Sequence, residues 1–365
     1  MITAFERQVM KRLIRLASQK RGLTKPNPMV AAAVIKANDV IAIGVHECSG
    51  GPHAEVIALQ KAGERARGAT VLVTLEPCTH TGQTPPCCDA LIQAGVKTVK
   101  YAINDPSAKV RQRPAAQWLT EAGINVVANC MEPEARRLND VFFCVHEKNK
   151  PFITVKVGQS LDGKIALSNG VSQYITGEKA RKEAHKCRRE ADIVLVGAGT
   201  VRADNPRLDV RYKLLKGYQS PHKGVVSMRA NVSQSADMFA DGGATIIMDE
   251  EHWSPSLANE WAGIATLQPL PFPNGKLDWS SFMAQCISNQ WHHVLIEGGS
   301  ALITSALAAG VVNQVIAFIA PKILGSRSDL SWVDLSPNKA LSDCIELVDV
   351  QTKMVGNDIM MSGYV

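Results

Sequence analysis

The chain opens with apolar side chains spaced three or four residues apart, which is the pattern of one face of a helix. These positions are Phe5, Val9, Leu13 and Leu16. Pro26 and Pro28 come next and end the pattern, because proline interrupts helical hydrogen bonding. The N-terminal segment is therefore predicted to be an amphipathic helix.

Beyond these prolines, short runs of apolar and β-branched residues predict strands that are covered on both faces. Three of them occupy residues 30–35, 69–75 and 96–103. Two helical stretches, 53–62 and 88–94, lie between them, and each is followed by a glycine that favours a helix end. This alternation is typical of a layered α/β domain.

A polar segment at residues 147–151, which ends in proline, marks the expected domain boundary. We therefore expect one domain at residues 1–148 and another at 151–365. The second domain repeats the alternation, with strands expected within 152–157, 192–197, 244–248, 293–299 and 311–324.

Two stretches of the second domain lack a clear period. We expect a loop at residues 212–222, and irregular structure at 253–279 apart from one strand near Ile264. No internal repeat is visible.

Composition narrows the class of protein. A chain of 365 residues, with 45% hydrophobic and 20% charged side chains, suits two globular domains with real cores. The net charge of +6 comes from scattered basic residues, so an anionic small molecule explains it as well as a nucleic acid does. We expect that the N-terminal segment is not a signal peptide, and no apolar run reaches membrane-spanning length. We expect a cytoplasmic protein with no membrane partner, whose nine cysteines stay reduced and can bind metal.

Four residues have the chemistry of a hydrolytic zinc site. His53, Cys78 and Cys87 offer one nitrogen and two thiolates, and Glu55 would stay off the metal and move protons. Zinc deaminases carry H-x-E followed by P-C-x-x-C, whereas here the second cysteine comes nine residues after the first. Positions two apart on a regular helix point about 200° apart, so His53 and Glu55 can serve one metal only at an irregular helix start. Cys88 is the alternative second thiolate.

Four segments of the chain resemble the bifunctional riboflavin-biosynthesis deaminase–reductase family, as a somewhat divergent member. They are PNPMVAAAVI, GGPHAEVIAL, GATVLVTLEPCTHTGQTPPCCDAL and KVGQSLDGKIA. The resemblance runs almost end to end and implies a cytidine-deaminase-like α/β/α domain followed by a dihydrofolate-reductase-like α/β domain. It implies zinc-dependent deamination of 2,5-diamino-6-ribosylamino-4(3H)-pyrimidinone 5′-phosphate. NADPH then reduces the ribosyl group of the product to ribityl.

The resemblance also implies roles for individual residues. The long spacer between the cysteines is usual for the family, and Glu55 is its proton shuttle. Asn27, His46 and His80 would contact the substrate of the first domain, although Asn27 could also shape a turn and the two histidines could be ordinary loop residues.

In the second domain, the resemblance assigns two groups of residues. The substrate would be held by Ser172, Arg188, Arg207, Arg211 and Glu297. The NADPH would be contacted by Gly158, Tyr174, Thr200, Asp204, Gly298, Gly299 and Ser300. Glycines at strand-to-helix turns let backbone amides approach phosphates, but each pair also suits a plain tight turn, and there is no G-x-G-x-x-G. Asp162 and Lys164 receive no role, because a solvated turn explains them.

Several positions depart from the usual pattern of the family. They are Gln83, Ser107, the segment 111–113 with its two arginines, Ser227, Met228 and Tyr174. These changes leave the zinc residues intact and bear on phosphate and cofactor binding. A paralogue that retains only the deaminase activity, or acts on another pyrimidine nucleotide, therefore stays open as an alternative.

Two further classes stay open. A deaminase of nucleic-acid bases needs a basic or aromatic surface, and aromatics make up only 5% of the chain, so we expect no nucleic-acid partner. A non-catalytic member is disfavoured by the intact zinc residues in the first domain only. The resemblance suggests a homo-oligomer, a dimer or a tetramer.

Overall fold

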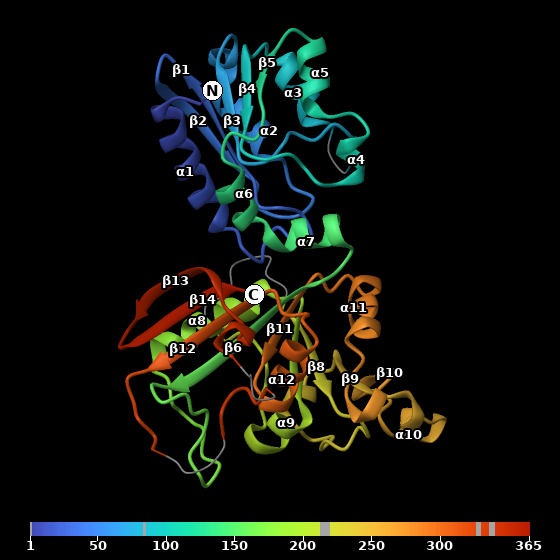
Figure 1. Cartoon of the computed structure of the whole chain (residues 1–365). Coiled ribbons are helices and arrows are strands. Elements are labelled where there is room, and N and C mark those ends of the chain that lie inside the picture. Colours follow the sequence, from blue (N-terminus) through green and yellow to red (C-terminus); the bar gives the residue numbers. More distant parts are fainter. Residues whose placement is uncertain (1, 83–84, 212–219, 326–329, 336–339) are drawn as a thin grey trace. The chain divides into compact units, whose positions relative to one another are not determined.

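The computed structural model describes residues 2–82, 85–211, 220–325, 330–335 and 340–365. The chain forms two compact units, Met1–Asn149 and Lys150–Val365 (Figure 1). Gln83 and most of the loop expected at 212–222 lie outside the described residues.

The first unit is built on a sheet of five strands. Their order across the sheet is β2 (Asp39–Val45), β1 (Ala31–Lys36), β3 (Thr70–Val73), β4 (Thr98–Tyr101) and β5 (Asn125–Val127). Strand β1 is antiparallel to both of its neighbours, and β3, β4 and β5 are parallel. The carboxyl ends of the parallel strands therefore meet at one edge of the sheet.

Helices cover both faces of this sheet because β1 is apolar on both sides. Ala32 and Val34 face a core formed with α2, α3 and α5, whereas Ala31, Ala33 and Ile35 face a core formed with α1, α6 and α7. The helices are α1 (Ala4–Ser18), α2 (Ala54–Ala62), α3 (Cys87–Gln93), α4 (Ala108–Arg111), α5 (Ala115–Glu121), α6 (Glu132–Leu138) and α7 (Asp140–Lys148), with a 3-10 turn η1 (Gly63–Ala66).

The second unit is built on a sheet of nine strands. Their order is β10 (Ala265–Leu270), β9 (Ala244–Asp249), β8 (His222–Val226), β7 (Ile193–Gly197), β11 (His293–Glu297), β6 (Phe152–Ser160), β12 (Gln314–Ala320), β14 (Asp358–Tyr364) and β13 (Val348–Val355). The seven strands from β10 to β12 are mutually parallel, and β14 and β13 are antiparallel to their neighbours. Loops at the carboxyl ends of parallel strands are the usual place for a ligand site.

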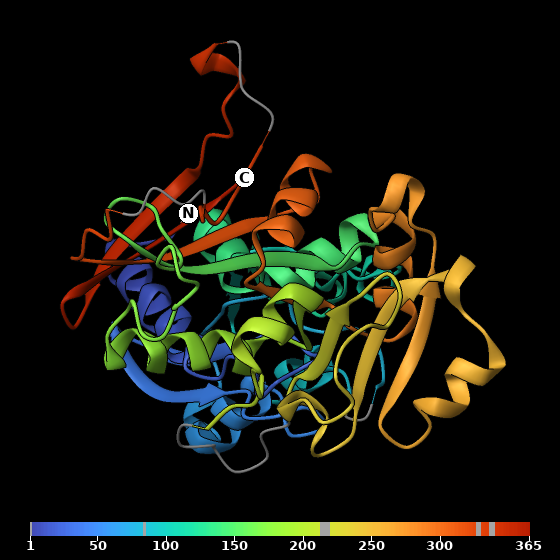
Figure 2. The same cartoon turned by 90° about the horizontal axis from the view of Figure 1, so that it is seen from below.

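Helices also cover both faces of this second sheet, which lies between α12 and α8 in Figure 2. One core joins the strands to α11 and α12, and the cores on the other face contain residues of α8, α9 and α10. The helices are α8 (Glu178–Glu190), α9 (Ala198–Asp204), α10 (Pro255–Glu260), α11 (Trp279–Ser288) and α12 (Ser300–Ala308). The 3-10 turns are η2 (Asp237–Phe239), η3 (Glu250–His252), η4 (Pro273–Gly275) and η5 (Leu341–Asp343).

The structure confirms the expected α/β architecture and corrects it locally. The apolar runs correspond to β1, β3, β4, β6, β7, β9, β11 and β12. The expectation of irregular structure at 253–279 was wrong in part, because this segment holds α10 as well as β10, the strand expected near Ile264. Strands β2, β5, β8, β13 and β14 were not predicted. Among the described residues, no helix combines the length and the apolar character needed to cross a membrane.

Candidate functional sites

The first candidate site begins where α2 starts. His53 is the residue before the helix and has extended backbone angles, φ −71° and ψ 158°, so its side chain does not follow the helical direction. Pro52 precedes it, and Glu55 is the second helical residue. This is the irregular helix start that a shared role for His53 and Glu55 requires. Gly44 on β2 leaves room for this helix start, because a Cβ at position 44 would lie 2.1 Å from the carbonyl oxygen of Ala54.

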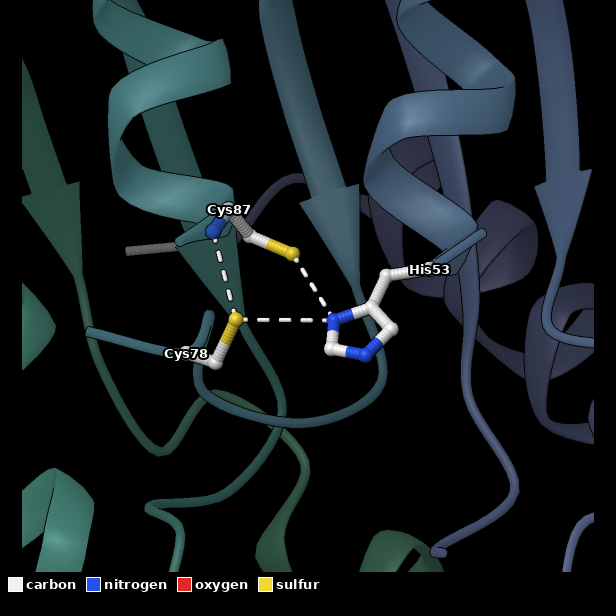
Figure 3. Close-up of side chains that lie close together, drawn as sticks. All are labelled: His53, Cys78 and Cys87. Carbon is white, nitrogen blue, oxygen red and sulfur yellow. Dashed lines mark hydrogen bonds between the residues drawn. The ribbon is translucent and has the colours of Figure 1, made fainter. Parts of the chain in front are cut away.

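Two cysteines meet the His53 ring at this point (Figure 3). The Nδ1 atom of His53 lies 3.1 Å from Sγ of Cys87 and 3.4 Å from Sγ of Cys78. Cys78 comes from the loop that follows β3, and Cys87 is the first residue of α3. The backbone N–H of Cys87 donates to Sγ of Cys78 at 3.2 Å. Three distant parts of the sequence thus bring one nitrogen and two sulfurs together.

The electrostatic environment of Cys78 and Cys87 favours one thiolate. Hydrogen bonding from Cys87 and from the neighbouring His53 lowers the pKa of Cys78 to about 4, against the opposing effect of burial. The pKa of Cys87 is raised, first by its hydrogen bond to Cys78 and then by burial. One thiol of the pair is therefore ionised readily, as a metal ligand must be.

The donor atoms of this group fit zinc. All three lie within 4.8 Å of one another. Tetrahedral zinc with Zn–N near 2.1 Å and Zn–S near 2.3 Å places nitrogen and sulfur about 3.6 Å apart. Three protein ligands leave the fourth position open for water, as in catalytic zinc sites. Cys88, the alternative ligand, is buried with its Sγ 3.9 Å from the carbonyl oxygen of Pro77, and the cluster of three forms without it.

Glu55 is enclosed next to these ligands, with 3% of its surface exposed. Burial raises its pKa to about 7, and the charge of the Cys78 thiolate adds to this effect. Hydrogen bonding to Cys87 and the charge of His53 act in the opposite direction. A carboxyl group with a pKa near neutrality can both accept and return a proton at physiological pH.

Asn27 contacts His46, and His46 in turn meets the ring of His53. The side-chain nitrogen of Asn27 lies 3.5 Å from Nε2 of His46. His46 is buried, its Nδ1 lies 3.0 Å from the carbonyl oxygen of Pro52, and its ring meets the ring of His53 edge to face at 5.5 Å. Burial lowers the pKa of His46. The structure therefore joins Asn27 and His46 to the zinc ligands through a short chain of contacts.

His80 lies two residues after Cys78 and is half-buried. Its Nδ1 is buried and has no hydrogen-bond partner within the described part of the chain. Asp105 is a charged neighbour of its ring. The loop around Asp105 is held by Glu76, whose carboxylate accepts from the N–H groups of Asp105 at 3.0 Å and Ala115 at 2.7 Å.

The second candidate site is a cavity of about 310 Å³ in the second unit. It lies at the carboxyl ends of neighbouring parallel strands and beside α8. Of the residues that the resemblance assigns, it is lined by Gly158, Ser172, Tyr174, Arg188, Thr200, Asp204, Arg211, Gly298 and Gly299. Glu297, Arg207 and Ser300 do not line it. Glu297 and Ser300 adjoin the lining glycines, and Arg207 is linked to the lining Arg211 only through Asp209.

A buried ion pair supports one wall of the cavity. Arg188 donates from Nε and Nη2 to the two carboxylate oxygens of Glu297, at 2.8 and 2.7 Å. Lys156 lies 3.3 Å from the same carboxylate. Burial alone would raise the pKa of Glu297, but Arg188 and Lys156 outweigh it and lower the pKa to about 2. Asp209 ties Arg207 and Arg211 together, each at 3.4 Å, and accepts from Arg188 through its carbonyl oxygen.

A glycine turn that leads from β11 into α12 also lines the cavity. Gly298 and Gly299 have φ values of 79° and 82°, which favour glycine. A Cβ on Gly299 would also lie 3.1 Å from Oγ1 of Thr200. Ser300 is the first residue of α12, so this turn leads directly into a helix start, where backbone amides can bind an anion. Ser172 donates to Asp204 at 2.8 Å across the same space.

Sequence reasoning missed six polar or aromatic residues of this lining. They are Lys156, Thr176, Arg181, His185, Phe318 and Trp332. Arg181 lies 4.1 Å above the ring of Tyr174, and His185 accepts from the N–H of Arg211 at 3.4 Å. A signal was present, because positions 181, 185 and 188 share one face of a helix, and Lys156 interrupts an apolar strand.

Four of the positions that depart from the family pattern have ordinary local partners. The N–H of Ser107 donates to Asp105, and Arg113 bonds Glu121 and stacks over Trp118 at 4.0 Å. Ser227 bonds Asn231 within a turn. Met228 packs against the core of the second unit.

The fold and the two sites define a class of protein. A three-layer α/β unit with a His–Cys–Cys group and a buried glutamate is the arrangement of a zinc-dependent base deaminase. It is joined here to an α/β unit whose cavity is lined by arginines and a glycine turn.

Comparison with known proteins identifies the family. Residues 4–103 match the cytidine and deoxycytidylate deaminase zinc-binding region, and residues 151–361 match the RibD C-terminal domain. The chain belongs to the RibD family of bifunctional deaminase–reductases of riboflavin biosynthesis, and both domains are present.

Relatives match over nearly the whole chain. The riboflavin biosynthesis protein RibD of Aquifex aeolicus (strain VF5) is 36% identical, covering 99% of this chain and 99% of its own length. The RibD of Escherichia coli (strain K12) is 35% identical, covering 96% and 97%.

Solved structures match in the same way. RibD of Acinetobacter baumannii has a TM-score of 0.82 at 29% identity over 97% of each chain. A diaminohydroxyphosphoribosylaminopyrimidine deaminase/5-amino-6-(5-phosphoribosylamino)uracil reductase of Thermotoga maritima has a TM-score of 0.80 at 31% identity, over 98% of this chain and 97% of its own. These findings confirm the family, the fold class and the pairing of deaminase and reductase expected from the sequence.

Proposed function

We propose that this chain removes the ring amino group of 2,5-diamino-6-ribosylamino-4(3H)-pyrimidinone 5′-phosphate and then uses NADPH to reduce the ribosyl group of the product to ribityl. The observation that carries the first step is the group of His53, Cys78 and Cys87 beside the buried Glu55. The name of the Thermotoga maritima relative describes a deaminase and a reductase of such phosphoribosylamino pyrimidines.

In the deaminase site, His53, Cys78 and Cys87 hold the metal. Zinc bound there supplies a Lewis acid that makes water a nucleophile near neutral pH. Glu55 takes the proton of the attacking water and returns it to the ring nitrogen and the leaving ammonia. Its raised pKa suits both directions of transfer. Asn27, His46 and His80 bind the pyrimidine and orient its amino-bearing carbon.

In the reductase site, the residues of the chain bind and orient. NADPH supplies the hydride when it is bound. Arg188, Arg207 and Arg211 pair with the anionic 5′-phosphate, assisted by Ser172. Glu297 holds Arg188 in place, and Asp209 lies between Arg207 and Arg211. Gly158, Tyr174, Thr200 and Asp204 would hold the cofactor, and the turn of Gly298, Gly299 and Ser300 would bind its phosphates.

The deaminase step is tested with Glu55→Gln, which preserves the shape of the side chain and removes its proton transfer. We expect zinc to stay at about one per chain, ammonia release to fall about 10²–10⁴-fold, and reduction of already deaminated substrate to be unchanged. The control is Glu64→Gln, an exposed residue of η1. Full ammonia release by Glu55→Gln would show that this mechanism is wrong.

A narrower function remains a specific alternative for the second unit, because Ser227 and Met228 stand where the family usually has an Asp–Ser pair. If ammonia is released and NADPH is not oxidised, the chain is a deaminase alone. As part of the same proposal, the enzyme works in the cytoplasm as a homo-oligomer. All nine cysteines are free thiols, as suits a reducing compartment.

A further inference from the structure

Asn139 makes a contact between two parts of the first unit that are far apart in sequence. It lies at the junction of α6 and α7 and is 3% exposed. Its Oδ1 accepts from the N–H of Met29 at 2.8 Å, and its Nδ2 donates to the carbonyl oxygen of Met29 at 3.0 Å. One amide thus satisfies both backbone groups of one residue, 110 positions earlier in the chain.

This pair of bonds resembles the exchange between two hydrogen-bonded residues of adjacent strands. Loss of the Asn139 amide would be destabilising, because a buried backbone group without a partner carries the full cost of its desolvation. Met29 is therefore held at one place relative to α6 and α7, immediately before β1 begins at Ala31.

Met29 directly follows the Pro26–Asn27–Pro28 segment, and the next links of the chain lead to the metal ligands. The carbonyl oxygen of Val30 accepts from the N–H of His46 at 2.9 Å. The Asn27 amide lies 3.5 Å from the ring of His46, and that ring bonds the carbonyl oxygen of Pro52 at 3.0 Å. The residue after Pro52 is the metal ligand His53.

We propose that Asn139 is a positioning residue of the deaminase site, which holds Met29 so that Asn27 and His46 stay in contact beside His53. This inference rests on the proposed deamination, because Asn27 and His46 matter only if they meet a substrate. Asn139 itself does not touch the reacting atoms. Its loss should move the groups that bind the substrate and leave the zinc ligands in place, since His53, Cys78 and Cys87 belong to other segments.

The test uses two variants of the full-length, zinc-loaded protein. Asn139→Leu has a similar volume and removes both hydrogen bonds. Asn139→Asp keeps the acceptor for the Met29 N–H and removes the donor to the Met29 carbonyl. Thr74→Val is the matched control, because Oγ1 of Thr74 is buried and accepts from the N–H of Ala31 at 3.1 Å, in the same strand region but outside the loop.

Five quantities are measured for each variant: KM and kcat of ammonia release, zinc per chain, the thermal midpoint, and the rate of reduction of already deaminated substrate. A displacement of about 1 Å at a binding group can cost about 10²-fold. We expect both Asn139 variants to raise KM about tenfold to a hundredfold, with about one zinc per chain and an unchanged reductase rate. Thr74→Val should lower the thermal midpoint and keep the KM of the unmodified protein.

Two results would overturn the inference. In one, an Asn139 variant is folded and zinc-loaded and keeps the original KM. In the other, KM rises only in proportion to lost stability, so that Thr74→Val shows the same rise. If the unmodified protein releases no ammonia from the pyrimidine, the proposed function itself fails, and the inference fails with it.

Discussion

The ion pair of Arg188 and Glu297 gives the strongest energetic prediction for the second unit. The perturbation is Glu297→Gln, which keeps the shape of the side chain and removes its charge. Arg188 would then lose a two-pronged charged partner at 2.7 and 2.8 Å, and Lys156 would lose one at 3.3 Å. Breaking one side of a buried ion pair costs about 3–5 kcal/mol.

The pKa of Glu297 gives an independent magnitude. Its pKa is about 2 in the folded chain, against an ordinary value of 4.5. That difference corresponds to about 3 kcal/mol of stability. Because the pKa is lowered on folding, the stabilisation is complete above about pH 4.5 and is lost as the pH falls toward 2. Both lines of reasoning therefore predict a loss of about 3 kcal/mol at neutral pH.

Unfolding in urea, followed by tryptophan fluorescence, measures this loss selectively. Every tryptophan except Trp118 lies in the second unit. For a unit of this size, about 3 kcal/mol corresponds to a fall of about 6–12 °C in the thermal midpoint. The control is Glu178→Gln on α8, the helix that carries Arg188. The pair of Glu178 with Lys182 is exposed and should contribute no measurable shift of the thermal midpoint. A Glu297→Gln protein as stable as the control would refute the reasoning. So would a stability difference between Glu297→Gln and the unmodified protein that is the same at pH 2.5 as at pH 6.

Three further predictions follow from the two sites. Cys87→Ser should lose bound zinc and ammonia release together, whereas Cys88→Ser should keep about one zinc per chain by metal analysis; the reverse result would exchange their roles. Gly299→Ala should raise the KM for NADPH without changing ammonia release, because its φ is 82° and its Cβ would meet a threonine hydroxyl at 3.1 Å. Gly310→Ala, with a φ of 65° and no atom within 4 Å, should be strained alike and keep the KM for NADPH, so an equal KM in the two variants would contradict this. Burial and two neighbouring arginines lower the pKa of His185 to about 4, and a bound phosphate that offsets those arginines should raise it. Phosphate affinity measured by calorimetry should therefore rise as the pH falls from 6 toward 4, and His185→Gln should abolish that rise; a slope that survives in the variant would exclude His185 as its source.

Sequence patterns predicted the elements that are buried on both faces. Strands such as β1 and β7 are almost wholly apolar, so periodicity alone finds them. Strand β8 was missed because it contains Lys223 and Gly224, whose places are explained only by the ion pair with Asp241 and by close packing on Leu195. Strand β13 was missed because seven of its eight residues are exposed.

The residues of the candidate sites also divide into those that the sequence indicated and those that it did not. The structure brings His53, Cys78 and Cys87 together, and the sequence indicated this group because each residue has distinctive chemistry and lies next to a helix start or a proline. Lys156 and His185 line the cavity through the pairing of β6 and the direction of α8, although the spacing of 181, 185 and 188 already indicated a basic face. Asn139 could not have been found, because nothing in the sequence links it to a backbone group 110 residues away.

The central claim is that the two units act in sequence on one substrate. The measurement is NADPH oxidation by the purified, zinc-loaded protein when it is given the undeaminated diaminopyrimidinone ribosylamine phosphate, with ammonia measured in the same tube. We predict that NADPH is consumed in step with ammonia release. Ammonia release without NADPH oxidation, or the absence of both, would contradict the claim.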